Sequence, residues 1–92
     1  MIQTIRHRGL KRLFQRDDKS GLNAEHLPRI IRVMAILDMA TSPQDLDLPG
    51  YRLHPLRGEL KGFWSVRITG NYRIIFRMED GDVYDIDLVD YH

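Results

Sequence analysis

The stretch "FWSVRITGNYRIIF", residues 63–76, alternates apolar and polar side chains on both sides of a Thr-Gly-Asn segment. A period of two residues is typical of β-strands that bury one face. For the apolar faces of both strands to lie on one side of a hairpin, the loop must hold an odd number of residues. We therefore predict an antiparallel hairpin with a three-residue loop over 69–71. Its core face comprises Trp64, Val66, Ile68, Tyr72, Ile74 and Phe76.

This register places Arg67 directly opposite Arg73, on the face that the core does not use. Like charges in that relation repel each other unless an anion lies between or beside them. The pair therefore predicts a phosphate-binding seat, because guanidinium groups bind phosphoryl oxygens well. In the alternative interpretation, Asp85 and Asp87 of the following strand simply neutralise the neighbouring arginines in surface ion pairs.

The closing segment "VYDIDLV", residues 83–89, continues the alternation. The same parity rule favours a three-residue Glu-Asp-Gly loop over 79–81 and rejects a two-residue Asp-Gly turn. In that register Asp87 lies across from Arg73. The side chains of this strand predicted to face the core are Tyr84, Ile86 and Leu88.

Upstream of the sheet, the pattern predicts a short strand over 2–5 and a first helix over 10–18. A second helix shows apolar residues at steps of three and four, and Pro28 near its beginning either makes the first turn irregular or delays the start of the helix. These elements predict one α+β domain, residues 1–92, in which a short strand and two helices pack on a three- to four-stranded antiparallel sheet. The apolar face of the second helix comprises Ile30, Val33, Met34 and Leu37.

Composition narrows the class of protein. The 92 residues include no cysteine, which excludes disulfides and thiolate metal sites and favours a reducing cytoplasm. No apolar run is long enough to span a membrane. Residues 1–78 contain all 14 Lys and Arg against seven acids, whereas residues 79–92 contain six acids and no Lys or Arg. A basic body of net charge +7 is typical of proteins that bind a polyanion, although a solvated basic face is an equal alternative.

The ionisable residues permit acid–base chemistry at a phosphate without a metal. His54 precedes a proline, Arg57 follows three residues later, and the chain ends in Asp90, Tyr91 and His92. No zinc-binding spacing, glycine-rich phosphate loop or Ser-His-Asp order is present. RNA cleavage needs a base for the 2′-hydroxyl, cations for the phosphoryl oxygens and an acid for the departing 5′-oxygen. The inventory supplies each of these groups.

The segments "LHPLRG", "FWSVRITGNYRIIF" and the terminal "DYH" together resemble the HigB toxins, a branch of the RelE superfamily of toxin–antitoxin ribonucleases. The similarity extends over essentially the whole chain. It departs from many relatives at Arg57, where they have lysine, and at Tyr72, where they have tryptophan. Arginine keeps the charge but excludes a role as a readily deprotonated base.

This resemblance implies a RelE-like microbial ribonuclease-type fold and a small cytoplasmic bacterial toxin. Such a toxin cleaves mRNA in the ribosomal A site of the 70S ribosome without a metal or other cofactor. A HigA-like antitoxin with a helix-turn-helix domain would restrain it. The resemblance implies five catalytic residues and two phosphate-binding residues, with the assignment of acid and base left open. They are His54, Arg73, Asp90, Tyr91 and His92, and Arg57 and Arg67, respectively.

Two other functions remain open from the sequence. A ParE-like toxin of the same architecture acts on DNA gyrase, and would not need His54 together with a terminal His92. A non-catalytic RNA- or anion-binding module would use the arginine face, and its histidines would be incidental. Loss of turnover without loss of ribosome binding in His92→Gln would distinguish a nuclease from such a module.

Overall fold

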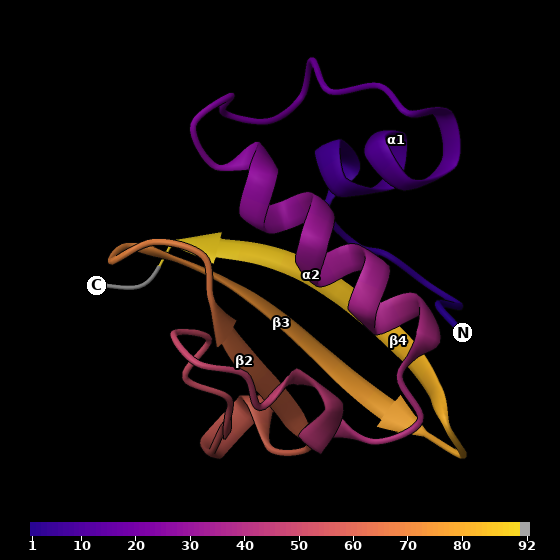
Figure 1. The fold of residues 1–92 in the computed structure, drawn as a ribbon. Helices are drawn as coiled ribbons and strands as arrows, with labels where there is room; N and C mark the ends of the chain where they lie inside the picture. Colours follow the sequence, from indigo (N-terminus) through magenta and orange to yellow (C-terminus); the bar gives the residue numbers. More distant parts are fainter. Residues whose placement is uncertain (91–92) are drawn as a thin grey trace.

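A computed structural model of the chain describes residues 1–90 (Figure 1). Two α-helices come first, and a four-stranded sheet with two short 3₁₀-helices follows. In chain order the elements are α1 (Arg8–Arg16), α2 (Leu27–Met39), η1 (Pro43–Leu46), β1 (His54–Pro55), η2 (Gly58–Leu60), β2 (Phe63–Arg67), β3 (Tyr72–Glu79) and β4 (Asp82–Asp90).

The sheet has the strand order β1-β2-β3-β4, and each neighbouring pair is antiparallel. Both α-helices lie over the same face of this sheet, as Figure 1 shows. The predicted α+β architecture is therefore confirmed. The opposite face carries no helix of this pair, and we call it the outer face.

The core fills the space between the helices and the inner face of the sheet. The predicted apolar face of α2 is buried: Ile30, Val33 and Leu37 are 0% exposed, and Met34 is 4% exposed. Phe76 of β3, at 0% exposure, is the largest of the fully buried side chains. Burial of such side chains supplies most of the free energy of folding. The strands contribute Val66, Ile74, Phe76, Val83 and Ile86 to the core, and Ile68, just beyond β2, joins them.

The helix starts follow local chemistry. His7 caps α1, where its Nδ1 accepts a hydrogen bond from the Leu10 amide at 3.2 Å. The helix α2 begins at Leu27, and Pro28 lies in its first turn, where the missing amide hydrogen removes no intrahelical bond. The predicted opening strand is reduced to two isolated parallel bridges to β4, one of which joins Ile2 to Val83.

The hairpin of β2 and β3 has the predicted register. Val66 lies opposite Ile74, and Arg67 lies opposite Arg73. Beyond the strands, the Ile68 amide donates to the Tyr72 carbonyl at 2.9 Å, which closes the three-residue loop over 69–71. The parity argument therefore gives the correct loop here.

The hairpin of β3 and β4 corrects the prediction. Glu79 lies opposite Asp82, so the turn contains two residues, with φ of 52° at Asp80 and 82° at Gly81. Positive φ at both central positions is the conformation that two-residue hairpins favour. The expected three-residue loop over 79–81 is wrong.

A β-bulge restores the parity that this turn upsets. Between the Arg77–Tyr84 and Ile75–Asp87 pairs, β4 has two residues and β3 has one. The extra residue is Asp85, with φ of 56°. As a result, Asp87 lies opposite Ile75 and not opposite Arg73, whose partner is Val89, and Tyr84 lies on the outer face beside Arg77 and not in the core. The predicted pairing of Asp87 with Arg73 and the predicted core position of Tyr84 are therefore wrong.

Within residues 1–90, neither α-helix has the length and hydropathy that crossing a lipid bilayer requires.

Candidate functional site

The outer face of the sheet carries most of the residues that the sequence singles out. Alternation along the strands directs every second side chain to it, because directly opposed residues share a face. From β1 to β4 the set comprises His54, Phe63, Ser65, Arg67, Arg73, Ile75, Arg77, Tyr84, Asp87 and Val89.

At one end of this face lies the predicted phosphate seat. Arg67 and Arg73 are a directly opposed pair and both are half-buried. The Nε and Nη1 atoms of Arg73 are buried beneath the surface of the face. The Arg29 guanidinium of α2 fixes the strand below, since its Nη1 donates to the Arg67 carbonyl at 3.2 Å and to the Gly50 carbonyl at 3.0 Å. The guanidinium groups of Arg67 and Arg73 are thus carried by neighbouring strands, one of which is anchored to α2.

The middle of the face is a row that crosses all four strands. His54 lies opposite Ser65, Ser65 opposite Ile75, and Ile75 opposite Asp87. Ser65 is completely buried, and its Oγ has no hydrogen-bond partner within residues 1–90. Arg67 is the diagonal neighbour of His54, and such positions lie about 7–8 Å apart. A single phosphodiester can therefore contact both side chains.

The His54 ring is held by its own segment. Its Nδ1 lies 2.9 Å from the carbonyl oxygen of Arg52, while the ring remains partly exposed. Arg52 has φ of 50°. The imidazole is thus oriented by a backbone carbonyl, and its other nitrogen is left for chemistry.

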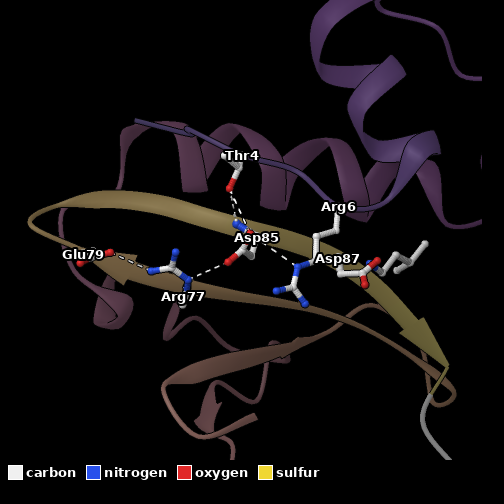
Figure 2. A network of polar contacts seen from close by, with 7 residues as sticks. Thr4, Arg6, Arg77, Glu79, Asp85 and Asp87 are labelled. Atoms are coloured by element: carbon white, nitrogen blue, oxygen red, sulfur yellow. Dashed lines mark hydrogen bonds and ion pairs between the residues drawn. The ribbon is translucent and has the colours of Figure 1, made fainter. Parts of the chain in front are cut away.

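At the far end of the face, one acid of β4 and one of β3 neutralise a different arginine (Figure 2). Nε of Arg77 donates to Oδ2 of Asp85 at 2.8 Å, and its Nη1 donates to Glu79 at 2.9 Å. Nε of Arg6 lies 3.6 Å from Oδ1 of Asp85. These hydrogen bonds, that from Arg77 first, lower the pKa of Asp85 below its usual range and raise the pKa of Arg77. The ion-pair interpretation therefore holds for this end of the face.

Thr4 completes the network around the bulge. Its Oγ1 accepts from the Asp85 amide at 2.8 Å and donates to the Asp85 carboxylate at 3.4 Å. Arg6 also stacks on Phe63, with 5.5 Å from its guanidinium carbon to the ring centre. These contacts join the amino-terminal segment to β4 and β2 and close this end of the face.

The remaining predicted site residues lie at the edges of the face or beyond the described chain. Asp90, which is exposed, lies opposite Tyr72 at the end of the sheet that carries Arg67 and Arg73, but this register directs it with Tyr72 to the face that packs on the helices. Tyr91 and His92 lie outside the described residues. Arg57 is exposed and follows Leu56, whose amide bonds the Phe63 carbonyl. Its backbone is thus at the opposite end of β2 from Arg67.

Sequence reasoning missed Ser65, Arg52 and Arg29 as parts of this site. Ser65 was assigned to the outer face, but no pattern indicated that its hydroxyl is buried. The left-handed backbone at Arg52 has no sequence signal, since arginine is not a residue that favours it. Arg29 lies off the apolar face of α2, and only tertiary structure shows that it bonds two main-chain carbonyls.

Within residues 1–90, no three His, Asp or Glu side chains lie close enough together to hold a metal ion. A hollow between α1 and α2 is lined mainly by apolar groups such as Leu13, Phe14 and Ile31. It is on the helical side of the molecule, away from the arginine pair. The outer face is therefore the candidate site.

Comparison with known proteins identifies relatives over the whole length of the chain. A family model described as "HigB-like toxin: RelE-like toxin of type II toxin-antitoxin system HigB" matches residues 3–92. The chain is 39% identical over 92 residues to "Endoribonuclease HigB" of Proteus vulgaris, with all of both chains covered. It is 32% identical over 83 residues to "Toxin HigB-1" of Vibrio cholerae serotype O1, covering 88% of this chain and 87% of the relative.

Solved structures give the same fold. The YoeB–YefM complex from Staphylococcus aureus contains a chain that matches with a TM-score of 0.63 and 19% identity, covering 100% of this chain and 95% of that one. At this identity the match establishes the fold alone. The predicted fold class is thereby confirmed against an independent structure.

Proposed function

The chain belongs to the HigB family of RelE-like toxins of type II toxin–antitoxin systems, and we propose that it is an endoribonuclease that cleaves mRNA in the ribosomal A site. The observation that carries this proposal is the directly opposed pair Arg67 and Arg73 beside His54 on the outer face. Neighbouring cations and an imidazole are the groups that phosphodiester cleavage requires.

The proposed reaction is an internal phosphoryl transfer. The 2′-oxygen of a ribose attacks the adjacent phosphorus, the bond to the 5′-oxygen breaks, and a 2′,3′-cyclic phosphate and a 5′-hydroxyl result. Arg67 and Arg73 stabilise the charge that develops on the phosphoryl oxygens. No metal ion or other cofactor is part of this proposal.

Proton transfer is assigned to His54, Asp90 and His92, with Tyr91 stacking on a base or orienting a hydroxyl. Arg57 is proposed to contact phosphate. Its exposure and its position beyond β1 favour a contact with the RNA backbone away from the reacting phosphate.

Dependence on the ribosome follows from charge. The closing strand is acidic, and Asp87 and Asp90 lie near the arginine pair, where they repel an RNA phosphate. We expect the isolated toxin to bind free RNA weakly and to rely on the ribosome for positioning. The basic surface of α1, which includes Lys11, Arg12 and Arg16, is a candidate contact for ribosomal RNA.

The partner that restrains this activity is proposed to be a HigA-like antitoxin with a helix-turn-helix DNA-binding domain, acting in the bacterial cytoplasm. A YoeB toxin of the same fold forms a complex with YefM, which is consistent with regulation by a bound antitoxin. Co-expression should therefore yield a stable complex and relieve growth arrest.

The decisive experiment maps transcript ends after brief induction of the toxin, and repeats the cleavage with purified mRNA. Cleavage in translated reading frames that needs 70S ribosomes supports the proposal. Equal, sequence-specific cleavage of purified mRNA with and without ribosomes would remove the ribosome dependence. Intact transcripts together with inhibited DNA supercoiling would instead indicate a toxin that acts on gyrase.

A further inference from the structure

The backbone of Arg52 has an unusual conformation. Four residues other than glycine have positive φ within residues 1–90, and three of them are aspartates: Asp17, Asp80 and Asp85. Short polar side chains tolerate the left-handed region, whereas arginine rarely adopts it. Arg52, with φ of 50°, is the exception. Conformations of this kind persist where the surrounding structure fixes them, often at functional sites.

The residues on either side of Arg52 are firmly held. Tyr51 is 4% exposed, its amide donates to the Leu48 carbonyl at 3.0 Å, and its own carbonyl accepts from the Arg67 amide at 2.7 Å. The Arg29 guanidinium covers the Tyr51 ring at 5.1 Å. Two residues later, His54 is paired with Ser65 in the sheet. Arg52 must therefore connect two fixed points.

This conformation places the Arg52 carbonyl against the imidazole of His54, with 2.9 Å between the oxygen and Nδ1. A carbonyl oxygen can only accept a hydrogen bond, so Nδ1 must carry the hydrogen. A neutral imidazole has one N–H. The lone pair of the neutral ring is therefore on Nε2.

We propose that Arg52 is a positioning residue that acts through its main chain: it holds His54 in the Nδ1–H tautomer and so makes Nε2 the base of the reaction. This inference rests on the proposed function and assigns one role that it leaves open. The 2′-hydroxyl proton passes to Nε2, the 2′-oxygen bonds to phosphorus, and the bond from phosphorus to the 5′-oxygen breaks. The departing 5′-oxygen takes a proton from the general acid, assigned to Asp90 or His92.

An alternative role for Arg52 makes the opposite prediction. Its side chain is exposed and cationic, and it lies two residues from His54, so it can be regarded as a further phosphate ligand. In that case the guanidinium matters and the backbone conformation does not. Substitutions that separate the two features decide between these roles.

Arg52→Gly removes the side chain but adopts positive φ freely, whereas Arg52→Val removes the side chain and strongly disfavours it. We expect Arg52→Gly to retain near-normal cleavage on programmed ribosomes and Arg52→Val to lose about 10²-fold or more, the lower range for a general base. Arg52→Asn, which tolerates the left-handed region, should behave like the glycine variant. If glycine and valine lose activity equally, the positioning role is overturned.

Nitrogen-15 NMR of the imidazole reads the tautomer directly, in the free toxin and without RNA. Nδ1 of His54 in the wild-type protein and in Arg52→Gly should show the shift of a protonated nitrogen, and Nε2 that of an unprotonated one, at a pH where the ring is neutral. The opposite pattern in the wild type overturns the inference, whether or not RNA is cleaved. Absence of cleavage with the expected tautomer overturns the proposed function and, with it, the role of His54 as base.

Discussion

Arg67 and Arg73 lie directly opposite each other across β2 and β3, on the sheet face that the α-helices leave uncovered. At the other end of that face, Arg6 and Arg77 form ion pairs with Asp85, and Arg77 also pairs with Glu79. Acids thus pair with arginines at one end of the face, while the opposed arginines bring two positive charges together at the other end. A phosphate is the ligand that such a pair fits best.

Arg73→Ala should lower the rate of mRNA cleavage on ribosomes by about 10²–10³, the usual cost of removing a preorganised group that stabilises developing charge. Single-turnover cleavage of a defined mRNA on programmed ribosomes measures this rate. Arg32→Ala, which removes an exposed cation of α2, is the matched control and should cleave normally. Near-normal cleavage by Arg73→Ala would show that this arginine is not the main cation of the site.

His92→Gln tests the carboxyl end of the chain, which lies outside the described residues. Glutamine keeps hydrogen-bonding capacity but cannot transfer protons near neutral pH, so we expect ribosome binding to persist and turnover to fall by about 10²–10⁴. Co-sedimentation with ribosomes and single-turnover cleavage measure the two properties separately. A non-catalytic binding module would lose little in either measurement.

The carboxylate of Asp85 should make stability depend on pH in the acid range. Its pKa is lowered chiefly by the hydrogen bond from Arg77, and further by Arg6 and Thr4. A lowered folded-state pKa adds stability that is fully present above the unfolded value of about 3.9 and is lost as pH falls through the folded value. Urea unfolding should thus show the wild type to be more stable than Asp85→Asn at pH 7, with the difference shrinking below about pH 4.

Asparagine is chosen for this comparison because it tolerates the left-handed conformation at the bulge. Asp85→Ala should be less stable than Asp85→Asn at every pH, since alanine must also adopt φ of 56°. If the two variants are equally stable, the bulge imposes no conformational demand at this position.

The two hairpins show how far sequence reasoning extends in this fold. In both hairpins the core-facing side chains of the two strands must lie on the same side of the sheet, and in both they do. In the first hairpin the loop satisfies it, so the Arg67–Arg73 pair is correctly predicted. In the second the chain uses its preferred two-residue Asp-Gly turn and corrects parity five residues later at Asp85. Alternation alone does not distinguish a longer loop from a bulge, and the predicted Asp87–Arg73 pairing was lost for that reason.

In the candidate site, too, alternation predicts which face a side chain occupies, but tertiary contacts decide how it is oriented. Alternation assigns Arg67, Arg73 and Ser65 to one face, because side-chain direction is a local property of a strand. The orientation of His54 depends on the Arg52 carbonyl. The position of that carbonyl depends in turn on the burial of Tyr51 beneath Arg29. The contact between Arg29 and Tyr51 joins segments that are distant in the sequence, and no local pattern encodes it.

Ser65→Ala should leave the free energy of unfolding unchanged or raise it by about 1 kcal/mol. The Ser65 hydroxyl is fully buried and has no hydrogen-bond partner within residues 1–90, so it has lost hydration without compensation. Ser65→Leu is the contrast, because a larger side chain between His54 and Ile75 overpacks the row and should cost about 1–3 kcal/mol. Urea unfolding of both variants measures these differences. Since the hydroxyl is buried beneath the face, Ser65→Ala should also cleave mRNA normally, whereas Ser65→Leu should displace His54 and lose activity. A marked loss of stability in Ser65→Ala would show that the hydroxyl forms a hydrogen bond that the protein depends on.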